Sequence, residues 1–264
     1  MKKIVSTLLL VLAFSACSEY QKALKNEDVA VKFDLATKLY DAGKYSKAIR
    51  LFEQIAPAYR GKPQAEKMYY MYAQAFYKTK QYYISAGRFE SFVASYPKSE
   101  KVEEASFLEA VSYSKSSPVY SLDQTETNKG IERMQAFIDE FPNSTYLTEA
   151  NVIAKALREK LEKKSFEIAY EYYKISDHKS AMIALDNFIV DYPGTQYKEK
   201  ALFYKLNSSF IVAENSFINK METRLTDAKL AYNALIKFNP NTTYKNKADD
   251  MLAQIEKDLK QFSK

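Results

Sequence analysis

The chain has 264 residues and a hydrophobic content of 47%, which fits a soluble globular protein with one or two cores. Only 5 Gly and 7 Pro are present, too few turn residues for a many-stranded β fold, so the composition predicts an all-α protein. The formal net charge of +6 is mild, and without a run of five or more Lys or Arg no nucleic-acid partner is expected.

Residues 1–16 have the features of an export signal, with two lysines, an apolar run from Ile4 to Phe14 and two small residues. The apolar run is too short to span a bilayer. The only cysteine, Cys17, follows, and the run Phe-Ser-Ala-Cys resembles the lipobox of bacterial lipoproteins, in which this cysteine is acylated and becomes the N-terminus. We therefore predict a lipid anchor on Cys17 and a tether at residues 17–28. An ordinary signal peptide with an incidental cysteine is the alternative.

A pattern of Pro, then Ser or Thr two residues on, then Ala eight residues on, occurs four times in the chain. Its copies end at Ala105, Ala150, Ala201 and Ala248. Proline disfavours helical geometry in the preceding residue, so a helix has to end there. The hydroxyl residue is expected to cap the next helix by accepting a bond from a free backbone N–H, and the alanine lets another helix approach closely. The hydroxyl residues are Ser99, Ser144, Thr195 and Thr242.

We call each copy of this Pro–Ser/Thr–Ala pattern a mark. A second pattern fills the segments between the marks and is clearest at Ala36–Ile55. Gly43 breaks the chain, and an apolar stripe with helical spacing begins at Tyr45. The pattern recurs at Ala73–Phe92 and Ala169–Phe188. It resembles the tetratricopeptide repeat, and the resemblance predicts a right-handed solenoid of about five helical hairpins. The expected hairpins are at about residues 29–60, 66–97, 103–142, 164–193 and 199–240, with a terminal helix at Tyr244–Lys264.

Two of the expected hairpins depart from the pattern. In the third, residues 116–128 insert about eight residues between the helices, and in the fifth, residues 213–225 lengthen the same region. A long amphipathic helix at about Tyr146–Lys164 is expected to run into the fourth hairpin. We therefore predict an N-terminal set of three hairpins at residues 29–142, and a C-terminal set of two hairpins with the terminal helix at residues 143–264.

The lipobox, the five hairpins and two longer segments together resemble the BamD family of outer-membrane assembly lipoproteins over nearly the whole chain. The two segments are DQTETNKGIERMQAFIDEFPNS at residues 123–144 and KSFEIAYEYYKISDHKSAMIALDNFIVDYPGTQ at residues 164–196. The resemblance implies a non-enzymatic subunit of the machine that folds β-barrel proteins, anchored in the outer membrane and facing the periplasm. It also implies that the C-terminal repeats hold the periplasmic domains of BamA and that the N-terminal repeats meet unfolded barrel precursors.

The first helices of the N-terminal hairpins contain the candidate binding residues. Ala36, Ala73 and Ala110 are expected to be their buried small positions, which places several aromatic residues on the groove-facing side. These residues are Phe33, Tyr40, Tyr70, Tyr77 and Phe107. A groove of this kind suits an extended or helical peptide with aromatic side chains.

The sequence predicts no enzyme site, metal site or cofactor. The one histidine, His178, and an acylated cysteine can build neither a zinc site nor a nucleophile pair, so His178 is expected to be a half-buried packing residue. Two other non-enzymatic functions remain open. One is a carbohydrate-binding lipoprotein of the SusD type, a longer class of protein that stacks sugars on tryptophan, which this chain lacks. The other is a periplasmic repeat adaptor for cell-wall synthesis or division, like CpoB.

Overall fold

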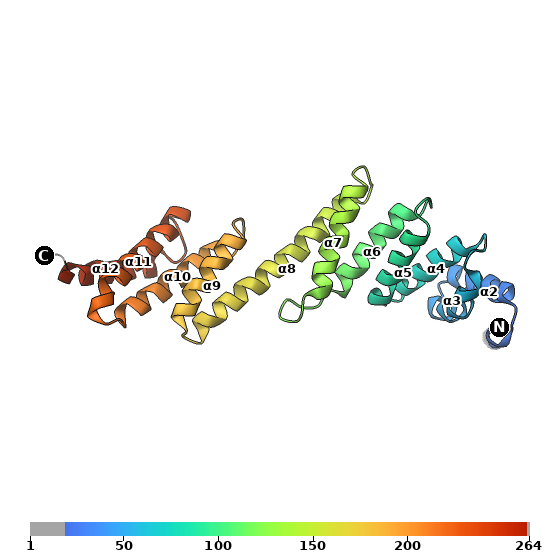
Figure 1. Cartoon of the computed structure of the whole chain (residues 1–264), viewed down its shortest axis with the longest axis horizontal. Helices are drawn as coiled ribbons and strands as arrows, with labels where there is room; N and C mark the ends of the chain where they lie inside the picture. The colour runs from blue at the N-terminus through green and yellow to red at the C-terminus, as the bar shows by residue number, and fades with distance from the viewer. Residues whose placement is uncertain (1–18, 263–264) are drawn as a thin grey trace, which may run out of the picture. The chain divides into compact units, whose positions relative to one another are not determined.

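A computed structural model describes residues 19–262, and within that range every regular element is a helix (Figure 1). This confirms the all-α prediction. The helices belong to two compact units. The first unit contains residues 19–119 and 123–157, and the second contains residues 120–122 and 158–262.

The first unit contains the three N-terminal hairpins that the sequence predicts. Each helix packs on the next one along the chain, and buried side chains such as Phe52 and Tyr72 form the core between neighbouring hairpins. The helices are α2 (Val29–Asp41), α3 (Tyr45–Tyr59), α4 (Ala65–Lys78), α5 (Tyr82–Ser95), α6 (Val102–Ser116) and α7 (Thr125–Glu140).

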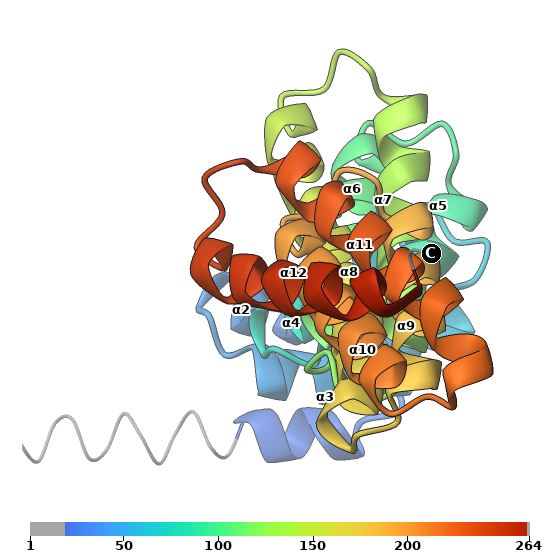
Figure 2. The same ribbon diagram turned by 90° about the vertical axis from the view of Figure 1, so that its left-hand side faces the viewer.

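The second unit contains the two C-terminal hairpins and the terminal helix, and Figure 2 shows α10, α11 and α12 as neighbours. Its helices are the last part of α8 (Leu147–Lys174), then α9 (His178–Asp191), α10 (Lys198–Glu214), α11 (Ile218–Phe238) and α12 (Lys245–Leu259), followed by a short 3-10 helix at Lys260–Phe262. The insertion at residues 213–225 does not lengthen the connection, which is only residues 215–217. It lengthens the helices instead, to 17 residues in α10 and 21 in α11.

Helix α8 is uninterrupted over 28 residues, which confirms that the long helix runs into the fourth hairpin. Neither glycine nor proline occurs within it, so no residue type that commonly ends a helix is present. Its residues up to Leu157 belong to the first unit and those from Arg158 onward to the second. The division between the units therefore falls inside a helix, whereas we expected two sets that meet near residue 142.

The tight turn inside a hairpin has the same backbone conformation in the first, second and fourth hairpins. A residue in the left-handed region occupies it, namely Gly43 (φ 71°), Lys80 (φ 61°) or Ser176 (φ 63°). Two residues later a ring packs edge-on against the first helix of the hairpin. These pairs are Tyr45 on Tyr40 at 5.3 Å, Tyr82 on Tyr77 at 5.7 Å and His178 on Tyr173 at 5.7 Å between ring centroids. His178 is thus a half-buried packing residue in the place of the turn tyrosine, as predicted.

The marks between hairpins are built as the sequence predicts, with one shift. Each hydroxyl accepts a backbone N–H two residues on, and this N–H belongs to the residue immediately before the helix instead of the first turn. The bonds run from Lys101 to Ser99, Tyr146 to Ser144, Tyr197 to Thr195 and Tyr244 to Thr242, at 3.0–3.2 Å. The alanine of every mark is fully buried, which confirms its expected role in close helix packing.

Three of the same hydroxyls also reach back to the hairpin that they close. Each donates to a glutamate that is the second residue of that hairpin's first helix. The pairs are Ser99 with Glu66 at 2.6 Å, Ser144 with Glu103 at 2.6 Å, and Thr242 with Glu199. The bond from Thr242 lowers the pKa of the Glu199 carboxyl. Each of these three hydroxyl side chains therefore links the start of the helix that follows it to the start of the first helix of the preceding hairpin.

Residues 19–25 are helical, although we expected them to be part of a tether. Tyr20 and Ala23 are buried in the core of the first hairpin, and the ammonium group of Lys47 lies 5.2 Å from the centroid of the Tyr20 ring. Their helical spacing gives this short segment an apolar face that packs on the repeats. The predicted signal segment 1–16 and Cys17 lie outside the described residues.

Candidate binding site on the first unit

One aromatic residue occupies the same position in the first helix of every hairpin. These residues are Phe33, Tyr70, Phe107, Phe166 and Phe203. The four phenylalanines are at most 5% exposed, whereas Tyr70 is only partly buried. Phe33 and Phe107 are therefore core residues, and the expectation that they line an open groove is wrong in this structure.

The phenylalanines are buried because another ring of the chain covers each of them. On three of them a tyrosine from the following mark lies almost parallel to the ring. The stacked pairs are Tyr146 on Phe107 at 4.5 Å and 12°, Tyr197 on Phe166 at 4.9 Å and 12°, and Tyr244 on Phe203 at 4.0 Å and 10°. Phe33 instead packs against Tyr59, with 5.1 Å between centroids. Stacked rings bury a large apolar area, so these positions belong to the core.

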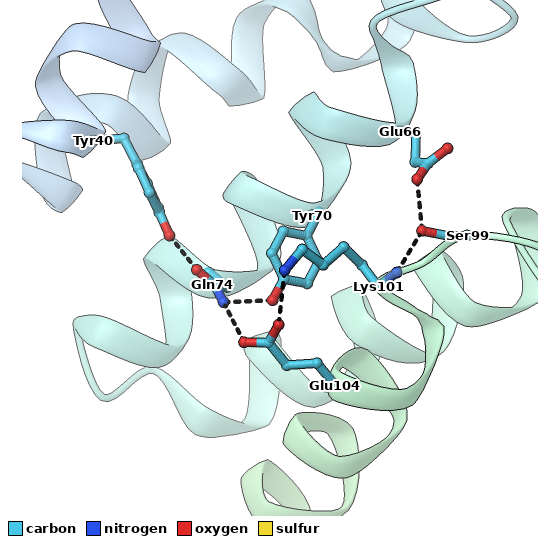
Figure 3. A network of polar contacts seen from close by, with 7 residues as sticks. All are labelled: Tyr40, Glu66, Tyr70, Gln74, Ser99, Lys101 and Glu104. Atoms are coloured by element: carbon cyan, nitrogen blue, oxygen red, sulfur yellow. Dashed lines mark hydrogen bonds and ion pairs between the residues drawn. The ribbon is translucent and has the colours of Figure 1, made fainter. Parts of the chain in front are cut away.

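Tyr70 differs because the residue that follows in its mark is Lys101 and not tyrosine (Figure 3). The ammonium group of Lys101 lies 5.6 Å from the centroid of the Tyr70 ring and 3.2 Å from Oε2 of Glu104. Phe92 of α5 also packs against the ring, with 5.4 Å between the ring centroids. The ring of Tyr70 therefore packs against the core, and the Lys101 side chain lies over it where the other marks place a tyrosine.

Tyr40 and Tyr70 are joined through Gln74, in what we call the Tyr40–Tyr70 network, the residues Tyr40, Tyr70, Gln74, Lys101 and Glu104 (Figure 3). The hydroxyl of Tyr40 donates to Oε1 of Gln74, and Nε2 of Gln74 donates to the Tyr70 hydroxyl at 2.7 Å. The same Nε2 lies 3.4 Å from Oε1 of Glu104. The network thus connects α2, α4 and α6, the first helices of three successive hairpins.

Burial and the neighbouring carboxylate keep both tyrosines of the network protonated. Burial, followed by the nearby Tyr45 and Asp41, raises the pKa of Tyr40 to about 12. Burial also raises the pKa of Tyr70 far above its ordinary value, and the hydrogen bond with Glu104 raises it further. Near neutral pH these phenols are therefore hydrogen-bonding and packing groups, not bases or nucleophiles.

Tyr77 is not among the hydrogen-bonded residues of the Tyr40–Tyr70 network. Its ring packs edge-on against Tyr82 at the turn, and the ammonium group of Lys115 lies 6.0 Å from its centroid. Of the five aromatic residues predicted to line the groove, Tyr40 and Tyr70 are thus the two joined by hydrogen bonds through Gln74, and Tyr77 packs with Tyr70 against the core cluster that contains Phe89 and Phe92.

Gln74 and Lys101 are site residues that our sequence reasoning missed. A signal for Gln74 was present, because the offset of 133 that relates Ala36 to Ala169 also relates Tyr40 to Tyr173 and Gln74 to Asn207. In the second unit Nδ2 of Asn207 donates to the Tyr173 hydroxyl at 3.3 Å. A signal for Lys101 was also present, because its mark is the one of the four without a tyrosine two residues after the hydroxyl residue.

The second unit contains the related pair in a different setting. Around Tyr173 the rings of Tyr170 and Tyr204 gather, with centroids 4.4–5.7 Å apart. Burial, followed by a hydrogen bond with Tyr170, raises the pKa of Tyr204 well above its ordinary value. In the second unit the Tyr173–Asn207 pair thus lies beside a cluster of tyrosine rings.

The described part of the chain contains no group of three His, Cys, Asp or Glu side chains that could hold a metal ion. Among the same residues, no helix is long and apolar enough to cross a bilayer. Because it combines the partly exposed ring of Tyr70 with polar groups, the Tyr40–Tyr70 network is a candidate site for binding another molecule through rings and hydrogen bonds.

One protein family matches this chain over most of its length. Its profile, described as YfiO, outer membrane lipoprotein, matches residues 25–208 and again residues 160–262. The relatives of this chain include several proteins named outer membrane protein assembly factor BamD, three of which follow. The protein from Caulobacter vibrioides is 22% identical over 73% of this chain and 62% of its own length, which is less than two thirds of that relative. The proteins from Neisseria gonorrhoeae (25% identical; 76% of this chain, 82% of the relative) and Pasteurella multocida (22%; 87% and 94%) align more completely.

Proposed function

Because this chain belongs to the YfiO family of outer membrane lipoproteins, we propose that it is a lipid-anchored assembly factor for outer-membrane β-barrel proteins. In this role it is a scaffold that binds other polypeptides and catalyses no reaction. The names of its relatives support the proposal, since each is called an outer membrane protein assembly factor. Stacked helical hairpins are suited to this role because they expose long surfaces for polypeptide partners.

We place the binding of unfolded barrel precursors in the first unit, at the Tyr40–Tyr70 network. The observation that carries this assignment is the partly open ring of Tyr70, because the equivalent ring is buried in every other hairpin. Gln74 and Glu104 add hydrogen-bonding groups beside it. A site with an accessible ring and fixed polar groups can recognise a polypeptide segment.

We place the docking of BamA on the second unit. Several large apolar side chains are exposed there at the turns and on α9. They are Ile175, Ile183, Phe217 and Ile218, of which Phe217 is 85% exposed. Exposed apolar groups of this size are typical of protein interaction surfaces. One of these side chains, Ile183, lines a small apolar pocket together with Met182, Arg224 and Lys179.

The lipid anchor at Cys17 completes the proposal. Cys17 lies two residues before Glu19, where the helical segment begins. Since Tyr20 is already buried against the first hairpin, an acylated Cys17 would hold that hairpin close to the membrane surface. Each acyl chain contributes roughly 0.8 kcal/mol per buried CH₂, so several chains on one residue give stable attachment.

Purification of the tagged full-length chain from detergent-solubilised membranes tests the proposal. We expect the chain in the outer-membrane fraction, with an acylated Cys17 in the mass spectrum of the N-terminal peptide and a BamA-type barrel protein in the eluate. Cys17→Ser should release the chain from the membrane. Recovery of unmodified chain in the soluble fraction without any barrel protein would contradict the proposal.

The docking assignment has its own matched pair of variants. Phe217→Ser removes an exposed ring of the second unit, and Tyr83→Ser removes one of the first unit that is 68% exposed. Because both side chains are largely in solvent, both variants should fold like the wild type. We expect only Phe217→Ser to reduce the amount of BamA recovered, and equal losses from both would place BamA elsewhere.

A further inference from the structure

The chain itself shows what packs on the ring position that Tyr70 occupies. In the third, fourth and fifth hairpins a tyrosine two residues after the hydroxyl residue of the mark covers the equivalent phenylalanine. The centroids of these stacked rings are 4.0–4.9 Å apart and their planes differ by 10–12°. The position in this fold is therefore shaped to take a flat aromatic ring.

In the second hairpin the residue that covers the ring of Tyr70 is Lys101, and its side chain can be displaced easily. Its side chain is 54% exposed, and it forms an ion pair with Glu104 in the first turn of α6, the helix that Lys101 precedes. Exposed ion pairs of this kind contribute little free energy. The side chain can therefore swing away while its backbone N–H keeps its bond to the Ser99 hydroxyl.

We propose that the ring of Tyr70 is a stacking site for one aromatic side chain of a bound polypeptide, which displaces the side chain of Lys101. The incoming ring takes the place that Tyr146, Tyr197 and Tyr244 take on the other hairpins. The inference rests on the proposed function, because it names the side-chain class by which the first unit recognises a precursor.

Two features favour an aromatic ring over a cationic side chain at this site. Lys101 already places an ammonium group near the ring, so an incoming cation would only replace an existing contact. An aromatic ring would instead bury new apolar area against the partly exposed ring of Tyr70.

The Tyr70 ring is also held ready for binding. Gln74 donates to its hydroxyl at 2.7 Å, and Phe89 and Phe92 pack against it with centroids 6.2 and 5.4 Å away. A ring that is already ordered loses little conformational entropy when a ligand stacks on it. Only the Lys101 side chain has to move.

Filling the site from within tests the proposal. Lys101→Tyr should stack on Tyr70, since tyrosine occupies the same place in the three other marks. The probe is a fluorescent synthetic peptide of alternating valine and threonine with one central phenylalanine, and its binding to the full-length protein in detergent is measured by anisotropy. Matched peptides have leucine or arginine at the centre.

We expect the wild type to prefer the phenylalanine peptide to the leucine peptide by up to about 10-fold, and Lys101→Tyr to abolish that preference. Lys101→Gln removes the charge without filling the site, so it should keep the preference. If Lys101→Tyr does not fold, as judged by circular dichroism, Tyr70→Leu provides the second variant, because it removes the ring and should also remove the preference.

The proposal is overturned if Lys101→Tyr or Tyr70→Leu, when folded, retains the wild-type preference for phenylalanine. It is also overturned if the arginine peptide binds as well as the phenylalanine peptide, since that result indicates a cation site. These failures leave the proposed function intact when BamA and precursors still co-purify with the wild type. Loss of that co-purification would contradict the proposed function whatever the peptides do.

Discussion

The ring of Tyr146 stacks on the ring of Phe107 at a centroid distance of 4.5 Å, with their planes 12° apart. Phe107 belongs to the first helix of the third hairpin, whereas Tyr146 precedes the long helix that follows that hairpin. The pair therefore joins segments that are distant in sequence. Its repetition in the next two hairpins shows that the mark between hairpins supplies core packing as well as a helix start.

Removal of this stack should destabilise the first unit. Tyr146→Ala deletes a partly buried ring and leaves Phe107 uncovered, so we expect the free energy of unfolding to fall by about 1–3 kcal/mol. Lys101→Ala, at the equivalent place on Tyr70, should change it by less than about 0.5 kcal/mol because that side chain is mostly exposed. Urea denaturation followed by circular dichroism measures both values. Equal effects would show that the stack contributes nothing beyond an ordinary surface residue.

The hydroxyl of Ser144 makes two bonds, and a second pair of variants measures what they contribute together. It accepts the backbone N–H of Tyr146 at 3.1 Å and donates to Glu103 at 2.6 Å. Ser144→Ala removes both bonds and should cost about 1 kcal/mol of unfolding free energy, whereas Ser144→Thr keeps the hydroxyl and should cost less. If alanine and threonine variants unfold at the same urea concentration, the two bonds of this hydroxyl together are not stabilising.

The sequence alone was sufficient to predict the repeated hairpins, but it was insufficient to predict which aromatic side chains are exposed. Proline marks, hydroxyl caps and buried alanines follow from local backbone rules, so the five hairpins could be placed to within a few residues. Whether Phe33 and Phe107 face a groove depends on which rings cover them, and Tyr59 and Tyr146 come from segments far away in the chain. Helical periodicity gives the side of a helix that a residue occupies, but not what packs on that side.

Other misses have similar physical causes. The short segment at residues 19–25 lies beside the expected anchor, where a tether was the simpler interpretation, yet Tyr20 and Ala23 pack on the first hairpin. In the fifth hairpin the inserted residues extend α10 and α11, because residues 213–225 contain neither glycine nor proline to force a long loop.

The tight turns predict opposite effects for two glycine substitutions. Gly43 has φ of 71° and open space around the position of a Cβ atom, so Gly43→Ala introduces backbone strain without a collision. We expect a loss of about 1 kcal/mol in unfolding free energy. Lys80 has φ of 61° in the equivalent turn, and Lys80→Gly should relieve strain there. Thermal unfolding of both variants checks the prediction, and destabilisation by Lys80→Gly would refute the strain argument.

A buried carboxyl group in the third hairpin should make stability depend on pH. Glu109 on α6 is 5% exposed, and its Oε1 lies 3.1 Å from Nε of Arg133 on α7. Arg133 also pairs with Glu90 on α5, which accepts the Tyr113 hydroxyl at 3.0 Å and lies 3.7 Å from Lys129. Glu132 adds a further negative charge near Glu109.

Burial raises the pKa of Glu109 from an ordinary value of 4.5 to about 7, although Arg133 opposes the shift. The folded state therefore binds this proton more tightly than the unfolded state does. The contribution of the protonated group is complete below pH 4.5 and is lost as the pH rises through about 7. Unfolding free energy should accordingly fall with rising pH in this window, by about 1–3 kcal/mol.

Glu109→Gln tests this linkage because glutamine is similar in shape and carries no proton in this range. Near pH 5 the variant and the wild type should have similar stability, since Glu109 is then protonated in the folded state. Near pH 8 the variant should be the more stable of the two, because the wild type must bury a charged carboxylate while Arg133 still keeps Glu90 as its partner. Urea denaturation across this pH range gives the comparison. Parallel curves for the two proteins would show that Glu109 is already ionised in the folded state and that its pairing with Arg133 outweighs its burial.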